Sequence, residues 1–398
     1  MTIPFIDLKA QHNLIKTQIQ ANMDKVLEHG AYVMGPEIQE LEQNLARFCK
    51  QKYALACSSG TDALILSLLA LGIKPGDAVL TTPFTFFATA EAIAFIGAVP
   101  VFVDIDPATF NISPDHLSTA IRALKNKNDD TYPLPDSGKP NDLGHPTPDS
   151  LVPKAIISVD LFGLPCDYEK IEPIARQENL KLIVDAAQSF GATYRDRSTC
   201  SLGHAACTSF FPAKPLGCYG DGGMCFTGDP ETHERLTSLR VHGQGRDRYD
   251  NTRLGMNARM DTLQAAVLLA KMDIFAKELI LREKVASDYN LLFEQPGAGL
   301  STPSIPDSTK SAWAQYSLLA RDKEHRQAIF NKLKEHDIPW AVYYPVPLHL
   351  QKAFAYLGYK TNDFPVSEKI SERVFSLPMH PYLQKEDQQK IAAVVLSA

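Results

Sequence analysis

The chain has 398 residues, a net charge of −6 at pH 7, and a composition that is 44% hydrophobic and 22% charged, typical of a globular protein. Its net negative charge provides no positive potential that would attract nucleic acid. No apolar stretch approaches the ~20 residues of a membrane span. The first residues lack the basic start and apolar core of a signal peptide, and the seven cysteines lack zinc-like pairing. We therefore expect a cytoplasmic protein with reduced thiols, no membrane partner, no nucleic-acid partner and no metal.

The first two-thirds of the chain alternates short apolar runs with helical patterns. The predicted strands are residues 53–57, 78–81, 101–104 and 155–159, and the predicted helices are residues 62–71, 88–96 and 168–178. This alternation predicts an α/β fold with a mainly parallel sheet that helices cover on both faces.

The pattern changes after His242. Residues 262–293 read as one long helix, residues 313–321 as a strand and residues 325–336 as a helix, which indicates a smaller α+β domain. We expect a large domain at residues 1–242, and a linker helix with a small C-terminal domain at residues 243–398. Residues 126–153 are rich in Pro, Asp, Asn and Gly, so we expect a surface insertion, mobile or lid-like.

Lys214 and Asp185 together suggest a chemistry. A lysine that forms a Schiff base with pyridoxal 5'-phosphate (PLP) needs an acid beyond the ring, which keeps the pyridine nitrogen protonated while the cofactor accepts electrons. Alone, such a lysine is usually a solvated turn residue, and an aspartate after a strand usually caps a helix. Here Asp185 ends one strand-like run, residues 182–185, and Lys214 follows another, residues 207–210. Open α/β sheets bind ligands at the carboxyl ends of their strands.

The rest of a PLP site has candidates of its own. Gly60 and Thr61 lie between a predicted strand and a helix start, where backbone amides approach an anion, and Ser209 offers a second hydroxyl. The alternative for Thr61 is a plain N-cap. Phe86 is placed to stack on the pyridine ring and Gln188 to reach its phenolic oxygen; the alternatives are core packing and a turn-stabilising amide.

Five motifs, in chain order, resemble the DegT/DnrJ/EryC1/StrS family of PLP-dependent sugar aminotransferases across essentially the whole chain. They are Gly60-Thr-Asp62, Phe86-Phe-Ala-Thr89, Asp185-Ala-Ala-Gln-Ser-Phe190, Ser209-Phe-Phe-Pro-Ala-Lys214 and Gly255-Met-Asn-Ala-Arg-Met260. The resemblance implies fold type I, a seven-stranded mainly parallel sheet, and a homodimer with two active sites at the interface.

The resemblance also implies roles for individual residues. Lys214 matches the lysine that holds the cofactor, and Asp185 matches the partner of the pyridine nitrogen. Phe86 matches the stacking ring and Gln188 the contact to the ring oxygen. The matching phosphate ligands are Gly60, Thr61, Ser209 and, from the neighbouring subunit, Asn257.

Three further segments resemble one branch of this family: residues 214–223, 240–244 and 376–381. That branch aminates UDP-2-acetamido-2-deoxy-3-oxo-D-glucuronate, with L-glutamate as donor, for lipopolysaccharide O-antigen. Both substrates carry a carboxylate, which the guanidinium of Arg259 is suited to bind bidentately; the alternative is a surface salt bridge, for example with Asp261. Tyr343, Tyr344 and His242 are further candidates for sugar contacts.

Two rival classes stay open. A PLP-dependent sugar dehydratase on the same fold has a histidine at the position of Lys214, so the lysine disfavours it. A non-catalytic PLP or sugar-nucleotide binding protein leaves unexplained why the lysine, acid and phosphate groups all occur together. The sequence also leaves open which sugar and nucleotide are bound, and whether C3 or C4 is aminated.

Overall fold

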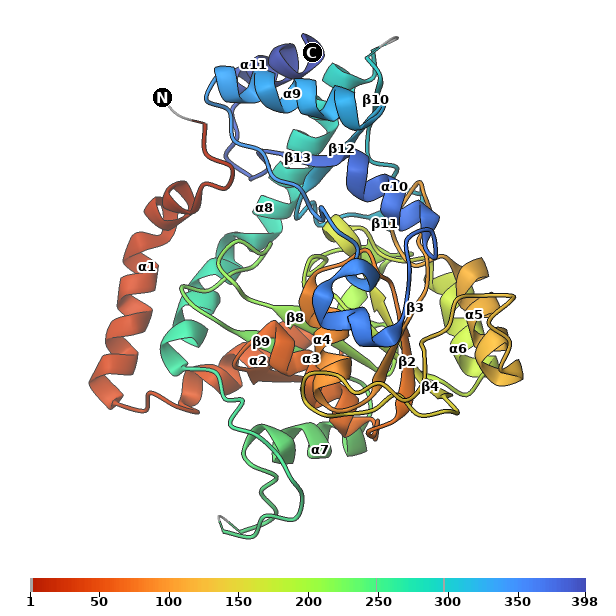
Figure 1. Cartoon of the computed structure of the whole chain (residues 1–398). Helices are drawn as coiled ribbons and strands as arrows, with labels where there is room; N and C mark the ends of the chain where they lie inside the picture. The colour runs from red at the N-terminus through yellow and green to blue at the C-terminus, as the bar shows by residue number, and fades with distance from the viewer. Residues whose placement is uncertain (1–2, 248, 296–297) are drawn as a thin grey trace.

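A seven-stranded sheet lies at the centre of the computed structural model, which describes residues 3–247, 249–295 and 298–398 (Figure 1). In spatial order its strands are β1 (Tyr53–Cys57), β9 (Gly223–Thr227), β8 (Ala205–Ser209), β5 (Lys181–Asp185), β4 (Val152–Val159), β2 (Asp77–Thr81) and β3 (Val99–Phe102). The pairs from β8 to β3 are parallel, and β9 runs antiparallel to both its neighbours. The predicted fold class, a mainly parallel seven-stranded sheet, is confirmed.

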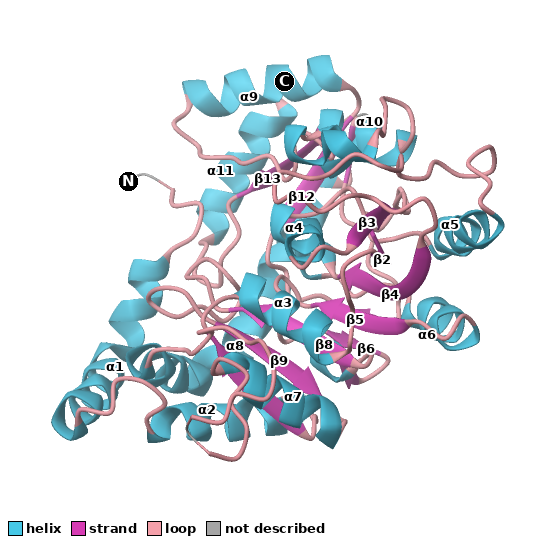
Figure 2. Ribbon diagram, turned by 60° about the horizontal axis from the view of Figure 1, so that its bottom comes forward, coloured by secondary structure: helices cyan, strands magenta, loops and turns pink. Residues whose placement is uncertain are grey.

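Helices cover both faces of this sheet, as Figure 2 shows. They are α2 (Pro36–Phe48), α3 (Gly60–Ala70), α4 (Phe87–Phe95), α5 (Pro114–Asn126), α6 (Tyr168–Gln177) and α7 (Pro230–Arg240). Side chains alternate along a strand, so Leu182 and Val184 of β5 pack into one core, with α2, α5 and α6, while Ile183 packs into the other, with α3 and α7. Burial on both faces explains why these strands read as continuous apolar runs.

The long predicted helix is present as α8 (Thr262–Phe293), with the predicted ends. It runs from the large sheet to the C-terminal part of the chain, and α1 (Leu8–His29) packs alongside it (Figure 1). The described residues contain no helix that is long and apolar enough to cross a membrane.

The C-terminal part contains a three-stranded sheet and three helices. These are β10 (Leu300–Ser301), β12 (Tyr316–Ala320), β13 (Val374–Leu377), α9 (Lys323–Glu335), α10 (Pro365–Arg373) and α11 (Lys385–Leu396). β12 is shorter than predicted because Trp313 has a left-handed φ of 49°, which a strand does not allow. α9 begins two residues earlier than predicted because the Asp322 side chain caps it, accepting a hydrogen bond from the His325 N–H.

Smaller elements complete the fold. They are β6 (Thr193–Tyr194), β7 (Arg197–Ser198), β11 (Thr309–Lys310), and the short 3-10 helices η1 (Leu161–Gly163), η2 (Thr199–Ser201), η3 (Leu348–Leu350) and η4 (Lys352–Leu357). The division into residues 1–242 and 243–398 remains a proposal. Phe354 and Phe364 pack into the core of the large sheet, and Ile3 packs into the C-terminal core.

The expected surface insertion, residues 126–153, is joined to the rest of the fold by hydrogen bonds. The buried Tyr132 hydroxyl accepts a hydrogen bond from Asp104 N at 2.9 Å. The Asp136 N–H donates to the Leu357 carbonyl at 2.8 Å, and the Asn141 amide donates to the Ala94 carbonyl at 3.2 Å. The insertion thus joins α4 to η4.

Candidate active site

A cavity of about 470 Å³ opens at the carboxyl ends of the parallel strands, a size that suits a cofactor with part of its substrate. Among the residues that line it are nine of the predicted site residues: Gly60, Thr61, Phe86, Asp185, Gln188, Ser209, Lys214, Tyr343 and Tyr344. The fold therefore brings together residues that lie up to 284 positions apart in the sequence.

One end of the cavity is formed by the start of α3 and the end of β8. α3 begins at Gly60, immediately after β1, and Ser59 is its N-cap, because the Ser59 Oγ accepts a hydrogen bond from Asp62 N at 3.0 Å. The alternative that Thr61 is the N-cap is therefore wrong. A Cβ at Gly60 would lie 2.6 Å from Ser209 Cβ, so only glycine allows the helix to start against β8. The helix N-terminus at Gly60 and the hydroxyls of Thr61 and Ser209 line this end of the cavity, here called the anion cup, because such groups stabilise a negative charge.

Asp185 lies at the end of β5 and is buried. Its Oδ2 accepts a hydrogen bond from Thr89 Oγ1 at 2.8 Å, and its Oδ1 accepts one from Ala187 N at 3.2 Å. No helix starts there, so the helix-cap alternative does not apply to Asp185. Burial raises the pKa of this carboxyl, while the two hydrogen bonds and the charge of Lys214 oppose the rise. Because burial disfavours the ionised carboxylate, a cationic group placed next to Asp185 would stabilise it.

Lys214 lies in the loop between β8 and β9, where its backbone N–H closes a turn onto the Phe211 carbonyl at 2.9 Å. Burial lowers the pKa of its amine, and the negative charge of Asp185 partly opposes this. A lowered pKa leaves more neutral amine near neutral pH, which makes Lys214 a better nucleophile and base.

Aromatic and amide side chains form the remaining walls. Phe86 is 55% exposed, and its ring centroid lies 6.3 Å from that of Tyr344. Gln188 Oε1 accepts a hydrogen bond from Phe162 N at 2.7 Å, and its Nε2 donates to the Tyr344 hydroxyl at 3.1 Å. Gln188 thus links the backbone at Phe162 to the Tyr344 side chain. Its amide nitrogen carries a second N–H, which is the donor that the predicted contact to the cofactor requires.

These residues fit PLP. The anion cup and the buried Asp185 carboxylate suit the phosphate and the pyridine nitrogen, and Lys214 supplies the amine. The exposed face of Phe86 suits a flat ring.

Three predicted residues do not line this cavity. Asn257 and His242 are exposed, and Arg259 is half-buried. The Arg259 Nε donates a hydrogen bond to Asn257 Oδ1 at 2.8 Å, so these two side chains do lie together, as their spacing predicted. Their predicted roles in cofactor and substrate binding stay predictions.

The sequence analysis gave no role to Thr89 or Ile6. Thr89 is buried in the first turn of α4, three residues after the N-cap Phe86, and reaches the cavity only through its hydrogen bond to Asp185. Ile6 lines the cavity from the N-terminal segment, where the sequence carries no signal.

Comparison with known proteins identifies the family. Residues 13–396 match the model of the DegT/DnrJ/EryC1/StrS aminotransferase family. The chain belongs to this family. It is 45% identical, over 99% of each chain, to the UDP-2-acetamido-2-deoxy-3-oxo-D-glucuronate aminotransferase of Pseudomonas aeruginosa.

Two solved structures of this family are similar throughout. The DegT DnrJ EryC1 StrS aminotransferase of Brucella abortus has a TM-score of 0.90 and 42% identity, covering 99% of this chain and 98% of that one. DesV of S. venezuelae, solved in complex with a ketimine intermediate, has a TM-score of 0.88 and 31% identity, covering 100% and 98%. The predictions of family, fold, PLP as cofactor and aminotransferase activity are confirmed.

Proposed function

We propose that this aminotransferase moves the amino group of L-glutamate to C3 of UDP-2-acetamido-2-deoxy-3-oxo-D-glucuronate, in the cytoplasm, for lipopolysaccharide O-antigen. One observation carries the proposal: Lys214, Asp185 and the anion cup meet in one cavity, in a chain similar over its full length to an enzyme named for that substrate.

The side chains of the cavity divide the work. When bound, PLP supplies an electron sink for the carbon that loses its proton. The Lys214 amine removes the Cα proton of glutamate and, in the second half-reaction, delivers a proton to C3 of the sugar. The buried Asp185 carboxylate stabilises a positive charge opposite it, because its own desolvation is relieved by a cation. The anion cup of Gly60, Thr61 and Ser209 holds the phosphate.

A homodimer with shared sites belongs to the same proposal. Asn257, Arg259 and His242 do not line the cavity of their own chain. They belong to a loop whose described parts, residues 241–247 and 249–259, extend from the end of α7 (Figure 1). Leu254 in this loop is 96% exposed, and an apolar side chain in that state suits burial against another surface. A second copy of the chain would place these residues at its neighbour's cavity.

The test is incubation of the PLP-loaded enzyme with glutamate, followed by a panel of UDP-linked keto-sugars. We expect amination of the 3-oxo uronate, with weaker turnover of a neutral 3-oxo sugar and of a 4-oxo sugar. Preferred amination of the 4-oxo sugar would replace the substrate assignment by another keto-sugar nucleotide. Absence of amino transfer from glutamate to any sugar would favour a binding protein.

Replacement of Lys214 tests the catalytic site independently of which sugar is the substrate. Lys214→Ala is expected to lose both the visible absorption of the bound cofactor and turnover, because the amine that holds the cofactor and moves the proton is gone. Retained transamination in this variant would contradict the role of Lys214.

A further inference from the structure

Lys271 is a fully buried lysine on α8 that the proposed chemistry does not use. Its side chain is 0% exposed, a rare state for a lysine. The Nζ donates a hydrogen bond to the Gly217 carbonyl at 2.6 Å and lies 4.5 Å from the ring centroid of Tyr219. Both partners belong to the loop that carries Lys214.

This loop, residues 210–222, is a compact structure. The Phe210 carbonyl accepts a hydrogen bond from Cys218 N at 2.7 Å, and the Phe211 carbonyl accepts one from Lys214 N at 2.9 Å. A Cβ on Gly217 would lie 2.5 Å from the Pro212 carbonyl oxygen, so the two halves of the loop touch. A shift at Gly217 is therefore transmitted to Lys214.

α8 supports the loop at two points. Gln264 Oε1 accepts a hydrogen bond from Tyr219 N at 2.8 Å, and Lys271 binds Gly217 two helical turns further along the same face of α8. From the other side, His12 Nδ1 of α1 lies 2.8 Å from the Tyr219 hydroxyl. The loop is thus held between α1 and α8.

We propose that Lys271 is a positioning residue for Lys214: its buried ammonium group fixes Gly217 and Tyr219, and through them the place of the Lys214 amine in the cavity. A methionine has similar length and would fill the space without the free-energy cost of burying a charge. Packing alone therefore does not account for the ammonium group, whereas a charge-assisted hydrogen bond and a cation–π contact to one loop do.

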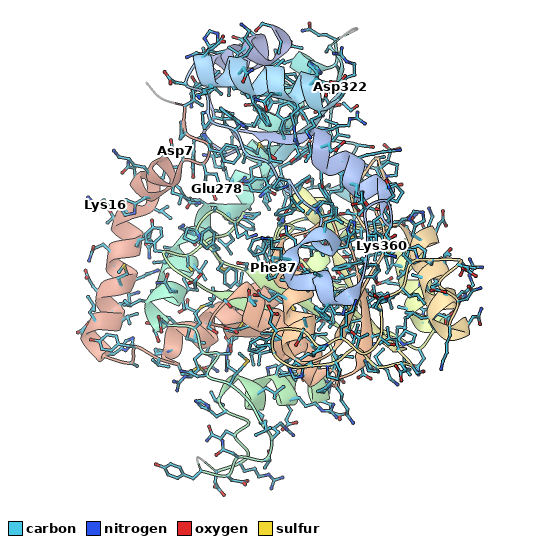
Figure 3. All side chains as sticks on the ribbon, viewed as in Figure 1. Asp7, Lys16, Phe87, Glu278, Asp322 and Lys360 are labelled. Atoms are coloured by element: carbon cyan, nitrogen blue, oxygen red, sulfur yellow. The ribbon has the colours of Figure 1, made fainter. Side chains whose placement is uncertain are left out.

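The charge of Lys271 also makes this support dependent on pH. Burial lowers its pKa to about 8, although Glu278, seven residues along α8 (Figure 3), and the Cys218 thiol in the loop partly oppose this. Burial raises the pKa of Cys218 and of Tyr219, so neither gains charge before Lys271 loses its own. His12 faces the Tyr219 hydroxyl and not the ammonium group. Above pH 8 the Gly217 contact weakens to that of a neutral amine.

The test measures how fast Lys214 captures the cofactor, and it rests on the proposed role of Lys214. Full-length apo-protein is mixed with PLP at a series of pH values and quenched with borohydride, and the labelled peptide is identified by mass spectrometry. Lys271→Met should slow capture at Lys214 roughly ten-fold or more, since small displacements of a reacting group cost up to about a hundred-fold. Ionisation of Lys214 itself makes capture depend on pH in both proteins, so the ratio of the wild-type rate to the variant rate is the informative quantity, and it should fall as the pH rises through about 8. Lys277→Met, at an exposed lysine of the same helix, is the matched control and should match wild type.

The outcomes separate the two proposals. If wild type is labelled at another lysine, the assignment of Lys214 fails. If wild type is labelled at Lys214 and Lys271→Met has the same rate and pH profile, the positioning role fails. If Lys271→Met does not fold, judged by circular dichroism, Tyr219→Leu tests the ring contact, with Tyr219→Phe as the control that keeps the ring and loses only the hydroxyl contact to His12. We expect Tyr219→Leu to capture PLP several-fold more slowly, and a wild-type rate would overturn the inference.

Discussion

Thr89 Oγ1 donates a 2.8 Å hydrogen bond to Asp185 Oδ2, and so joins the first turn of α4 to the end of β5, where Asp185 lines the cavity. The bond orients a buried carboxylate whose pKa is raised by burial. Thr89 therefore supports the ionised form of Asp185, which is the form that a protonated pyridine nitrogen needs.

Asp185→Asn is expected to keep PLP bound and to slow both half-reactions by on the order of a hundred-fold, because the charge that favours a protonated ring nitrogen is lost while the phosphate cup persists. Single-turnover absorbance measurements with glutamate, and then with the keto-sugar, check both halves. Thr89→Val should have a smaller effect in the same direction. Unchanged rates in Asp185→Asn would show that the carboxylate only stabilises the fold.

The same substitution has a second, opposite consequence for the apo-protein. The pKa of Asp185 is raised above its ordinary value of 3.8, so its burial costs stability as pH rises from about that value through the folded-state pKa. Apo Asp185→Asn should therefore melt at or above the wild-type temperature near neutral pH, and the difference should disappear in acid below pH 3.8. Thermal melts at several pH values measure this. If apo Asp185→Asn melts well below wild type near neutral pH, the hydrogen bonds of Asp185 stabilise the fold by more than its desolvation destabilises it.

The sequence predicted the fold class and nine of the residues that line the cavity. Strand ends could be located because apolar runs stop at Asp185 and near Ser209, and a parallel sheet brings such ends to one edge. Nothing in the sequence predicted that Gln188 would bind Tyr344, because the two residues are 156 positions apart and come together only through tertiary folding.

The insertion shows the opposite limit. Its Pro-rich and polar composition predicted a mobile or lid-like surface insertion, yet its own Tyr132 is buried and accepts a hydrogen bond from the Asp104 backbone. Composition averages over a segment, whereas one buried aromatic residue and a few backbone hydrogen bonds suffice to anchor it. The buried lysine on α8 was also missed, because within a helical pattern a lysine normally indicates an exposed face.

Tyr132→Phe tests the anchor of the insertion. Removal of the hydroxyl leaves the Asp104 N–H buried without its partner, so we expect a loss of about 1–2 kcal/mol in the free energy of unfolding, with kcat unchanged. Urea denaturation of the holoenzyme measures it. Tyr32→Phe, at a tyrosine exposed on the surface, is the matched control and should have almost no effect. Equal stability of the two variants would mean that water replaces the hydroxyl.

Shared active sites can be tested by complementation. Lys214→Ala and Asn257→Ala are each expected to be inactive or strongly impaired, because one lacks the amine and the other lacks the proposed contact to the neighbour's phosphate. In a mixed dimer, one cavity combines an intact Lys214 with an intact Asn257 from the other chain, so activity should recover in part. If subunit exchange is verified by mass spectrometry and no activity returns, the site is not shared.

Arg259 offers the sharpest test of the uronate assignment. Its Nε is held by Asn257 Oδ1, which leaves the planar fork of the guanidinium to face a carboxylate across the proposed dimer interface. Arg259→Lys keeps the charge but removes the fork. We expect kcat/KM for the uronate to fall by the equivalent of about 2 kcal/mol or more, and kcat/KM for the neutral 3-oxo sugar to change little.

Glutamate complicates this measurement, because it also carries carboxylates. The half-reaction with glutamate, followed alone, reports that contribution, and subtracting it isolates the effect on the sugar. A loss confined to the uronate would support Arg259 as its carboxylate ligand. Equal losses on both sugars, with a matching loss on glutamate, would mean that Arg259 binds the donor; the preference for a uronate would then need another residue, such as His242 on the same loop.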